Sequence, residues 1–291
     1  MKSCKLIFTF CLCLTAVFFA PSAPILAQTA PIAAANFKEV VESKLKNYQN
    51  VSLGKICPIE TDATANRIFS EYGAIFVSNG TTIPGRCIFN SEQEVQSFQT
   101  KANPQTETIG GIRITLQSAA MSALFAAQKA AAKKNLQITP RGGSLAAGRS
   151  FEATVKLWNS RFNPGLNYWV GRKKISAREA AAVRSYPIRE QVAKVLEWES
   201  EEIFFSKDLS KSILFSVAAP GASQHNFLLA LDVQQFANKE VRKILADHGW
   251  FQTVQSDAPH FTYLGIAESD LPAHGLKPVT FGGQKFWIPN L

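Results

Sequence analysis

Histidine is scarce in this sequence, with four residues among 291, and all four lie between residues 225 and 274. The sequence contains no P-loop, no dinucleotide-binding fingerprint, no internal repeat and no low-complexity tract. Charged residues make up 18% and hydrophobic residues 46% of the chain. This composition is too apolar for a disordered tail and too mixed for a fibrous or polytopic membrane protein.

Residues 1–27 predict a secretory signal peptide. Lys2 and Lys5 precede an apolar run of 14 residues, Leu6–Phe19, and a small residue, Ala27, offers a cleavage site. The run is shorter than the ~20 residues that a membrane-spanning helix needs, which disfavours an uncleaved anchor. We therefore expect a protein exported to the periplasm, the cell wall or the medium, without a membrane span after cleavage, and a linker over residues 28–36.

Removal of the signal peptide would leave two of the five cysteines, Cys57 and Cys87. Two cysteines in an exported chain predict one disulfide, and two reduced buried thiols are the alternative. The net charge of +9 is spread along the chain rather than clustered, so we expect no nucleic-acid partner.

The hydrophobic pattern changes along the chain. It predicts helices over residues 37–49, 117–135, from 151 onward, over 176–202 with a break at Pro187, and over 238–247. It predicts strands over residues 74–77, 87–89, 112–116, 136–139, 213–217, 228–233, 251–254 and 261–264. Helices followed by short strands favour an α+β fold with helices packed on a small antiparallel sheet. We expect an N-terminal subdomain over residues 37–108 and a second domain over residues 109–291.

The histidine-rich region offers a metal-ligand set. Asp232 lies in an apolar, alternating stretch, where a buried carboxylate needs a partner or a metal. If the strand at 261–264 pairs antiparallel with this one, Asp232 and His260 project from one face, and His225 approaches from the preceding loop. Two histidines and one carboxylate are a ligand set of catalytic Zn²⁺, which activates a water for attack on a carbonyl. Asp257, three residues before His260, is placed to take the proton.

These residues form motifs that resemble a known family. The pattern S-x-H-x6-D (Ser223, His225, Asp232) and the later acidic-x-x-H (Asp257, His260) resemble the zinc motifs of VanY-type D-alanyl-D-alanine carboxypeptidases, which share their metal site with hedgehog amino-terminal domains. The resemblance implies that His225, Asp232 and His260 bind Zn²⁺ and that Ser223 helps to hold the substrate carboxylate. It also implies a hedgehog/D,D-peptidase-like fold. The family's base is normally Glu, where this chain has Asp257.

The resemblance extends upstream, where the family places a carboxylate-binding arginine before a serine. Arg149, followed by Ser150, fits this position, and Arg184, followed by Ser185, is a rival. An arginine suits the role because its guanidinium pairs with a carboxylate through two hydrogen bonds. The separation from Arg149 to His225 is longer than in the family, so residues 160–212 are interpreted as a helical insertion.

Two hypotheses for the function follow. The first is an exported zinc peptidase that acts on peptidoglycan stem peptides and removes a C-terminal D-Ala. The second is a non-catalytic cell-envelope-binding domain that retains the fold, suggested by Asp257 in place of Glu. Serine-hydrolase patterns are weaker: the S-x-x-K sequences at 43–46 and 52–55 lack a downstream K-T-G, and His225 stands at the final Gly position of a nucleophile elbow.

Overall fold

The computed structural model describes residue 1 and residues 33–291, so the predicted signal peptide beyond Met1 and most of the predicted linker lie outside the described residues. Ala33–Leu291 form one compact unit. Its helices are α1 (Phe37–Gln49), α2 (Leu53–Ile56), α3 (Ala63–Tyr72), α4 (Glu92–Lys101), α5 (Ser118–Ala132), α6 (Phe151–Gly171), α7 (Ala177–Arg184), α8 (Ile188–Ser200) and α9 (Lys239–Asp247), with 3-10 helices η1 (Gly73–Val77), η2 (Gly143–Ala146), η3 (Ile213–Phe215) and η4 (Glu268–Asp270). Its strands are β1 (Pro104–Ile109), β2 (Ile112–Gln117), β3 (Ala230–Asp232), β4 (Trp250–Phe251), β5 (His260–Tyr263), β6 (Leu276–Phe281) and β7 (Gln284–Pro289).

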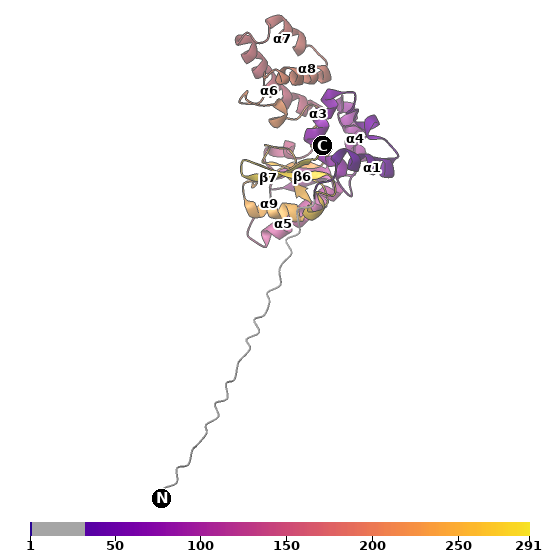
Figure 1. Cartoon of the computed structure of the whole chain (residues 1–291), viewed down its shortest axis with the longest axis vertical. Helices are drawn as coiled ribbons and strands as arrows, with labels where there is room; N and C mark the ends of the chain where they lie inside the picture. Colours follow the sequence, from indigo (N-terminus) through magenta and orange to yellow (C-terminus); the bar gives the residue numbers. More distant parts are fainter. Residues whose placement is uncertain (2–32) are drawn as a thin grey trace. The chain divides into compact units, whose positions relative to one another are not determined.

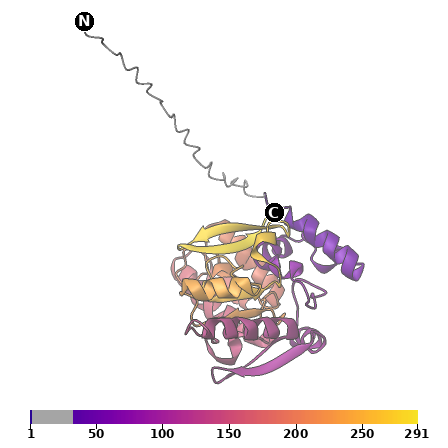
Figure 2. The ribbon, with the colours of Figure 1, turned by 90° about the horizontal axis from the view of Figure 1, so that it is seen from below.

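The strands of the described unit form three small antiparallel sheets, so the α+β class predicted from the sequence is confirmed. β1 pairs with β2, β6 pairs with β7, and the three-stranded sheet has the order β3-β5-β4. Helices α5 and α9 pack against each other between the two hairpins (Figure 2). Helices α6, α7 and α8 form a separate group at the top of Figure 1, and they lie within the predicted helical region that follows residue 150.

The helix starts near the site follow ordinary capping rules. The Ser150 hydroxyl accepts a hydrogen bond from the Ala153 amide at the start of α6, and the Asn238 side chain accepts from the first turn of α9. Trp158 of α6 and Trp250 of β4 are fully buried. The Arg149 backbone just before α6 is held beside His225, because its amide donates to the His225 carbonyl and its own carbonyl accepts from the Asn226 side chain.

Several predicted strands are wrong. Residues 74–77 lie in η1 and residues 213–215 form η3, and every residue of η1 is buried. Residues 87–89 form no strand: the Cys87 amide donates to the Ile56 carbonyl at the end of α2, and the Phe89 amide donates to the Gly221 carbonyl in a loop. The segment 136–139 runs beside β3 but pairs only through an isolated bridge at Pro140, which lacks an amide donor.

Cys57 and Cys87 form the predicted disulfide. The boundary predicted between residues 108 and 109 lies within β1, so it does not coincide with a break between compact units. Residues on either side of it are joined directly, because the Asn79 amide donates to the Leu264 carbonyl and the Tyr72 carbonyl accepts from the Gln224 side chain. Among the described residues no helix is long and apolar enough to cross a membrane.

Candidate metal centre

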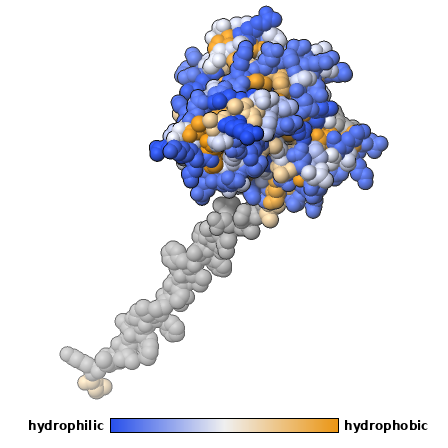
Figure 3. Space-filling model, turned by 90° about the horizontal axis from the view of Figure 1, so that it is seen from above, coloured by the Kyte–Doolittle hydropathy of each residue, from blue (hydrophilic) through white to orange (hydrophobic). Residues whose placement is uncertain are grey.

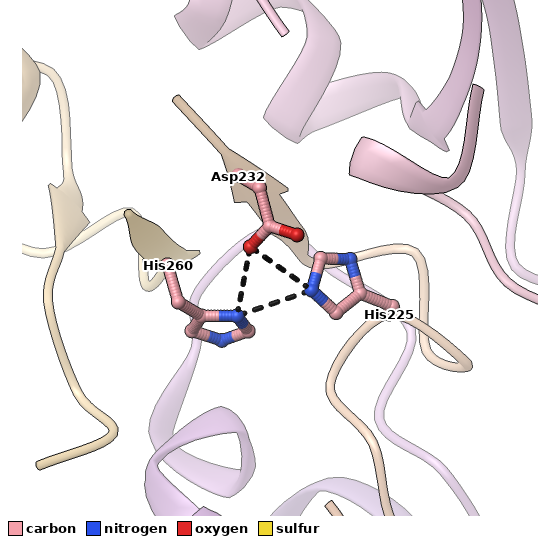
Figure 4. Close-up of side chains that lie close together, drawn as sticks. All are labelled: His225, Asp232 and His260. Atoms are coloured by element: carbon pink, nitrogen blue, oxygen red, sulfur yellow. Dashed lines mark hydrogen bonds and ion pairs between the residues drawn. The ribbon is translucent and has the colours of Figure 1, made fainter. Parts of the chain in front are cut away.

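The pairing of β3 with β5 places the predicted metal ligands side by side. The two strands are antiparallel, and Asp232 lies directly opposite His260 in the register. Residues that face each other across an antiparallel pair project from the same side of the sheet. His225 comes from the loop that leads into β3, and Figure 4 shows its ring pointing at the other two side chains. The juxtaposition expected from the alternating sequence is therefore present.

The three side chains approach one another through one atom each. His225 Nε2 lies 3.1 Å from His260 Nδ1, and each of these nitrogens lies 3.5 Å from Asp232 Oδ1. The side chains of His225 and His260 are 2% and 6% exposed, and that of Asp232 is 18% exposed. The group is thus largely withdrawn from solvent and open on the carboxylate side.

The outer nitrogens of both rings are held by acceptors. His225 Nδ1 lies 2.7 Å from the Ala147 carbonyl oxygen, which can only accept, so this nitrogen carries the ring proton. His260 Nε2 lies 2.8 Å from Gln224 Oε1, whose amide nitrogen donates to the Tyr72 carbonyl. Both assigned tautomers leave a lone pair on the nitrogen that faces Asp232. Such outer contacts are the usual way in which proteins orient metal-binding imidazoles.

Burial and charge shift the pKa values of His225 and Asp232. Burial and the nearby Arg149 charge lower the pKa of His225 to about 4, so its ring is neutral near pH 7. Burial alone would raise the pKa of Asp232, but its interactions with His225 and His260 hold that pKa well below the usual range. The centre therefore presents a neutral His225 imidazole and an ionised Asp232 carboxylate at neutral pH.

The donor set fits a divalent cation. Two imidazole lone pairs 3.1 Å apart cannot hydrogen-bond to each other when both ring protons are used elsewhere. Tetrahedral ligands held at ~2.0–2.1 Å from Zn²⁺ are separated by about 3.3 Å, close to the three separations found. Two histidines with one carboxylate are moreover a ligand set typical of catalytic zinc. His225, Asp232 and His260 could hold such an ion.

A cavity of about 190 Å³ opens onto this centre. The predicted residues Arg149, Ser223 and Asp257 line it together with the three candidate ligands. Burial raises the pKa of the Asp257 carboxyl, partly offset by His260, which suits a group that accepts a proton. Arg184 does not line this cavity: it is exposed on α7 and donates to Asn167 Oδ1.

The Arg149 guanidinium lines the cavity but already donates hydrogen bonds to two acceptors of the protein. Its Nη2 donates to Asp232 Oδ2 at 2.5 Å, and its Nε donates to the Leu145 carbonyl at 2.6 Å. Its side chain is 15% exposed. Arg149 therefore holds the carboxylate oxygen that faces away from the two histidines, a contact that the sequence did not predict.

Three further residues of the site were missed by sequence reasoning. Ala147 acts through its backbone, which leaves no trace in the residue type. Gln224 is fully buried, and its position beside His225 is the only sequence signal. Arg161 lines the cavity from α6, where its spacing from Thr154 and Leu157 places the three on one helix face.

Comparisons with known proteins give distant structural likenesses, and two of them are described below. No family model and no curated protein matches the sequence. One solved structure is a Zn(II) complex of a mutant of the vancomycin-resistance D,D-pentapeptidase VanY from a VanB-type cassette: it is 18% identical with a TM-score of 0.31, and the match covers 56% of this chain and 79% of that one. Another is VanYB in complex with D-alanine-D-alanine, 17% identical with a TM-score of 0.33, over 59% of this chain and 83% of that one. The chemistry of the cavity is therefore inferred from its own residues.

Proposed function

We propose that this chain is an exported zinc peptidase that hydrolyses D-Ala-containing peptidoglycan stem peptides, as a D-alanyl-D-alanine carboxypeptidase does. The observation that supports it is the convergence of three potential ligand atoms, from His225, Asp232 and His260, beside a cavity that Asp257 also lines. A structural metal site would have no need of an adjoining cavity or a nearby carboxylate. The D-Ala substrate rests on the resemblance of the Ser223–Asp232 and Asp257–His260 motifs to the VanY-type carboxypeptidases.

Each residue has a role in this proposal. A Zn²⁺ ion held by the three ligands would act as a Lewis acid, which polarises a carbonyl and lowers the pKa of water to about 7. Asp257 accepts the proton of the attacking water and passes it to the leaving amine. Arg149 fixes Asp232 through its outer oxygen. Ser223, buried at the cavity wall, orients the peptide.

Metal analysis of the purified chain without its first 27 residues tests the ligand set. We expect one zinc per chain in the parent and none in His260→Ala, because the two remaining ligands bind zinc weakly. His274→Ala is the matched control, since His274 is half-buried outside the cavity, where its Nδ1 contacts the Asp270 carbonyl. A parent protein that takes up no zinc at stoichiometric concentration would refute the proposed site.

Release of D-Ala from purified stem peptides tests turnover. We expect Asp257→Asn to lower kcat about 10²–10⁴-fold, the usual contribution of a general base, while the zinc content stays unchanged. Asp247→Asn, an exposed pair with Lys243 on α9, should leave kcat unaltered. Retention of zinc-loaded protein on cell walls without any product would instead favour the non-catalytic envelope-binding domain.

A further inference from the structure

One face of α6 forms a wall of the cavity. Thr154, Leu157 and Arg161 all line it, and their spacing of three and four residues places them on one side of the helix. Leu214 and Val217 add apolar surface. The wall therefore combines apolar side chains, which suit small aliphatic groups, with a single guanidinium.

Arg161 is oriented but not neutralised. Its Nε donates to the Ser216 hydroxyl at 3.0 Å, and its Nη1 donates to the Ser160 hydroxyl at 3.0 Å. Within residues 33–291, no carboxylate lies within ion-pair distance of its guanidinium. Two hydroxyls thus hold the side chain, and its positive charge has no ion-pair partner among residues 33–291.

The other charges around the cavity are already balanced. Arg149 is already paired with Asp232. Asp257 has a role in proton transfer and does not pair with Arg161. An incoming carboxylate therefore has one strong unfilled partner in the cavity, because guanidinium and carboxylate form short, charge-assisted hydrogen bonds.

We infer that Arg161, rather than Arg149, binds the free C-terminal carboxylate of the peptide substrate. This inference rests on the proposed function and deepens it, because recognition of a free carboxylate makes the site that of an exopeptidase. A peptide whose chain continues beyond the first residue after the cleaved bond would present no carboxylate there and would leave Arg161 without a partner. The substrate class is then a peptide with a small, carboxylate-bearing C-terminal residue.

A binding experiment separates the inference from turnover. An N-acetylated tripeptide ending in D-Ala-D-Ala is compared with its C-terminal amide by calorimetry, on zinc-loaded protein carrying Asp257→Asn so that no cleavage occurs. We expect the free acid to bind about 10–100-fold more tightly than the amide, the range of a charge-assisted pair. Adding Arg161→Met should bring this ratio close to one, and Arg161→Lys should retain part of it.

Controls distinguish the possible failures. Arg178→Met removes an exposed arginine of α7 and should leave the acid-to-amide ratio unchanged. Zinc content and circular dichroism of each variant exclude a folding defect, and the Lys variant keeps the test valid if the Met variant unfolds. Equal binding of acid and amide, no binding of either peptide, or a preference that survives Arg161→Met but is lost with Arg149→Met would each overturn the inference. Absence of zinc in the parent would refute the proposed function itself.

Discussion

At the scale of single residues, the geometry of the candidate metal centre depends on atoms that hold the two imidazole rings. His260 Nε2 is bound by Gln224 Oε1, and the same oxygen accepts from the hydroxyls of Thr253 and Thr262. The amide is fixed from its other end by the Tyr72 carbonyl. The orientation of His260 is therefore determined by a buried network rather than by its strand alone.

Replacing Gln224 should weaken metal binding without removing a ligand. We expect Gln224→Leu to raise the dissociation constant for zinc about 10–100-fold, because loss of such an outer contact frees the ring. Competition with a chromogenic chelator measures it. Gln96→Leu, on the exposed face of α4, is the control and should have no effect. An unchanged affinity in Gln224→Leu would mean that β5 alone orients His260.

The grouping of the three candidate ligands could be predicted from the sequence, and the contacts that hold their side chains could not. Asp232 and His260 were predicted because an alternating strand places a lone carboxylate among apolar residues. Gln224 has no such signal, since its partner Tyr72 is separated from it by 152 residues and becomes a neighbour only in the folded chain. Arg149 was predicted at the site, but its ion pair with Asp232 was not, because the two residues are 83 positions apart and meet only in the folded chain.

Glu199 gives a pH dependence that the sequence does not reveal. It accepts hydrogen bonds from the Ser212 hydroxyl and the Ile213 amide, yet burial raises its pKa above the usual 4.5. The folded state therefore holds the proton more tightly than the unfolded state. The contribution of Glu199 to stability is fully present below pH 4.5, and it is lost as the pH rises through the raised pKa that Glu199 has in the folded state.

The pH dependence is measurable by comparison with Glu199→Gln. As the pH falls through the raised pKa of Glu199 toward 4.5, the free energy of unfolding of the parent should rise relative to that of Glu199→Gln. Urea unfolding at a series of pH values measures the difference. Glu201→Gln, on an exposed residue, should show no such trend relative to the parent. A constant difference between parent and Glu199→Gln would contradict the raised pKa.

At the scale of secondary-structure elements, the predictions succeeded where a pattern was long or paired. Helices α1, α5 and α9 match their predicted ranges closely, and β3 and β5 lie within or beside theirs. Short apolar runs failed, because periodicity cannot separate a buried 3-10 turn from a strand. The hairpin of β6 and β7 was missed although the sequence has Gly282-Gly283 between two strand-like segments, a pattern typical of a two-residue turn.

The turn before Ser223 and His225 requires a glycine. Gly221 has a φ of +78°, and a Cβ there would lie 1.9 Å from the Phe89 carbonyl oxygen. We expect Gly221→Ala to lower the free energy of unfolding by at least ~1–2 kcal/mol, the cost of the left-handed conformation alone. Urea unfolding measures it.

Gly54→Ala is a matched control for that variant. Gly54 lies in α2, and a Cβ added there would have no neighbouring atom within 4 Å. The variant should therefore gain about 0.5–1 kcal/mol from the better helix former. If both alanine variants shifted stability equally, the close approach of the Phe89 backbone would not be the cause.

At the scale of the whole molecule, residues from the N-terminal region contact the candidate metal centre and its cavity. Tyr72, at the end of α3, lines the cavity and accepts from Gln224, and Phe89 pairs with Gly221 just before the site loop. The face in Figure 3 is mainly hydrophilic with small, scattered apolar areas. Segments far apart in the sequence thus line one cavity. A boundary near residue 108, drawn from the sequence, separates Tyr72 and Phe89 from the residues that they contact, Gln224 and Gly221.

The disulfide should stabilise the folded protein by restricting the conformations of the unfolded chain. Cys57 and Cys87 are separated by 30 residues, and closing such a loop is worth about 3–4 kcal/mol. We expect Cys57→Ala with Cys87→Ala to lower the free energy of unfolding by that amount, and chemical reduction of the parent to have the same effect. Neither cysteine lines the cavity.

Unfolding measured with and without zinc shows whether the disulfide acts only on the unfolded chain or also on the geometry of the candidate site. Bound metal raises stability by an amount that depends only on its concentration and affinity. If the disulfide acts through the unfolded chain, saturating zinc should raise the free energy of unfolding equally in the parent and in the double alanine variant, measured by urea unfolding. A smaller increment in the variant would mean that the disulfide also shapes the Tyr72 and Phe89 contacts on which the centre depends.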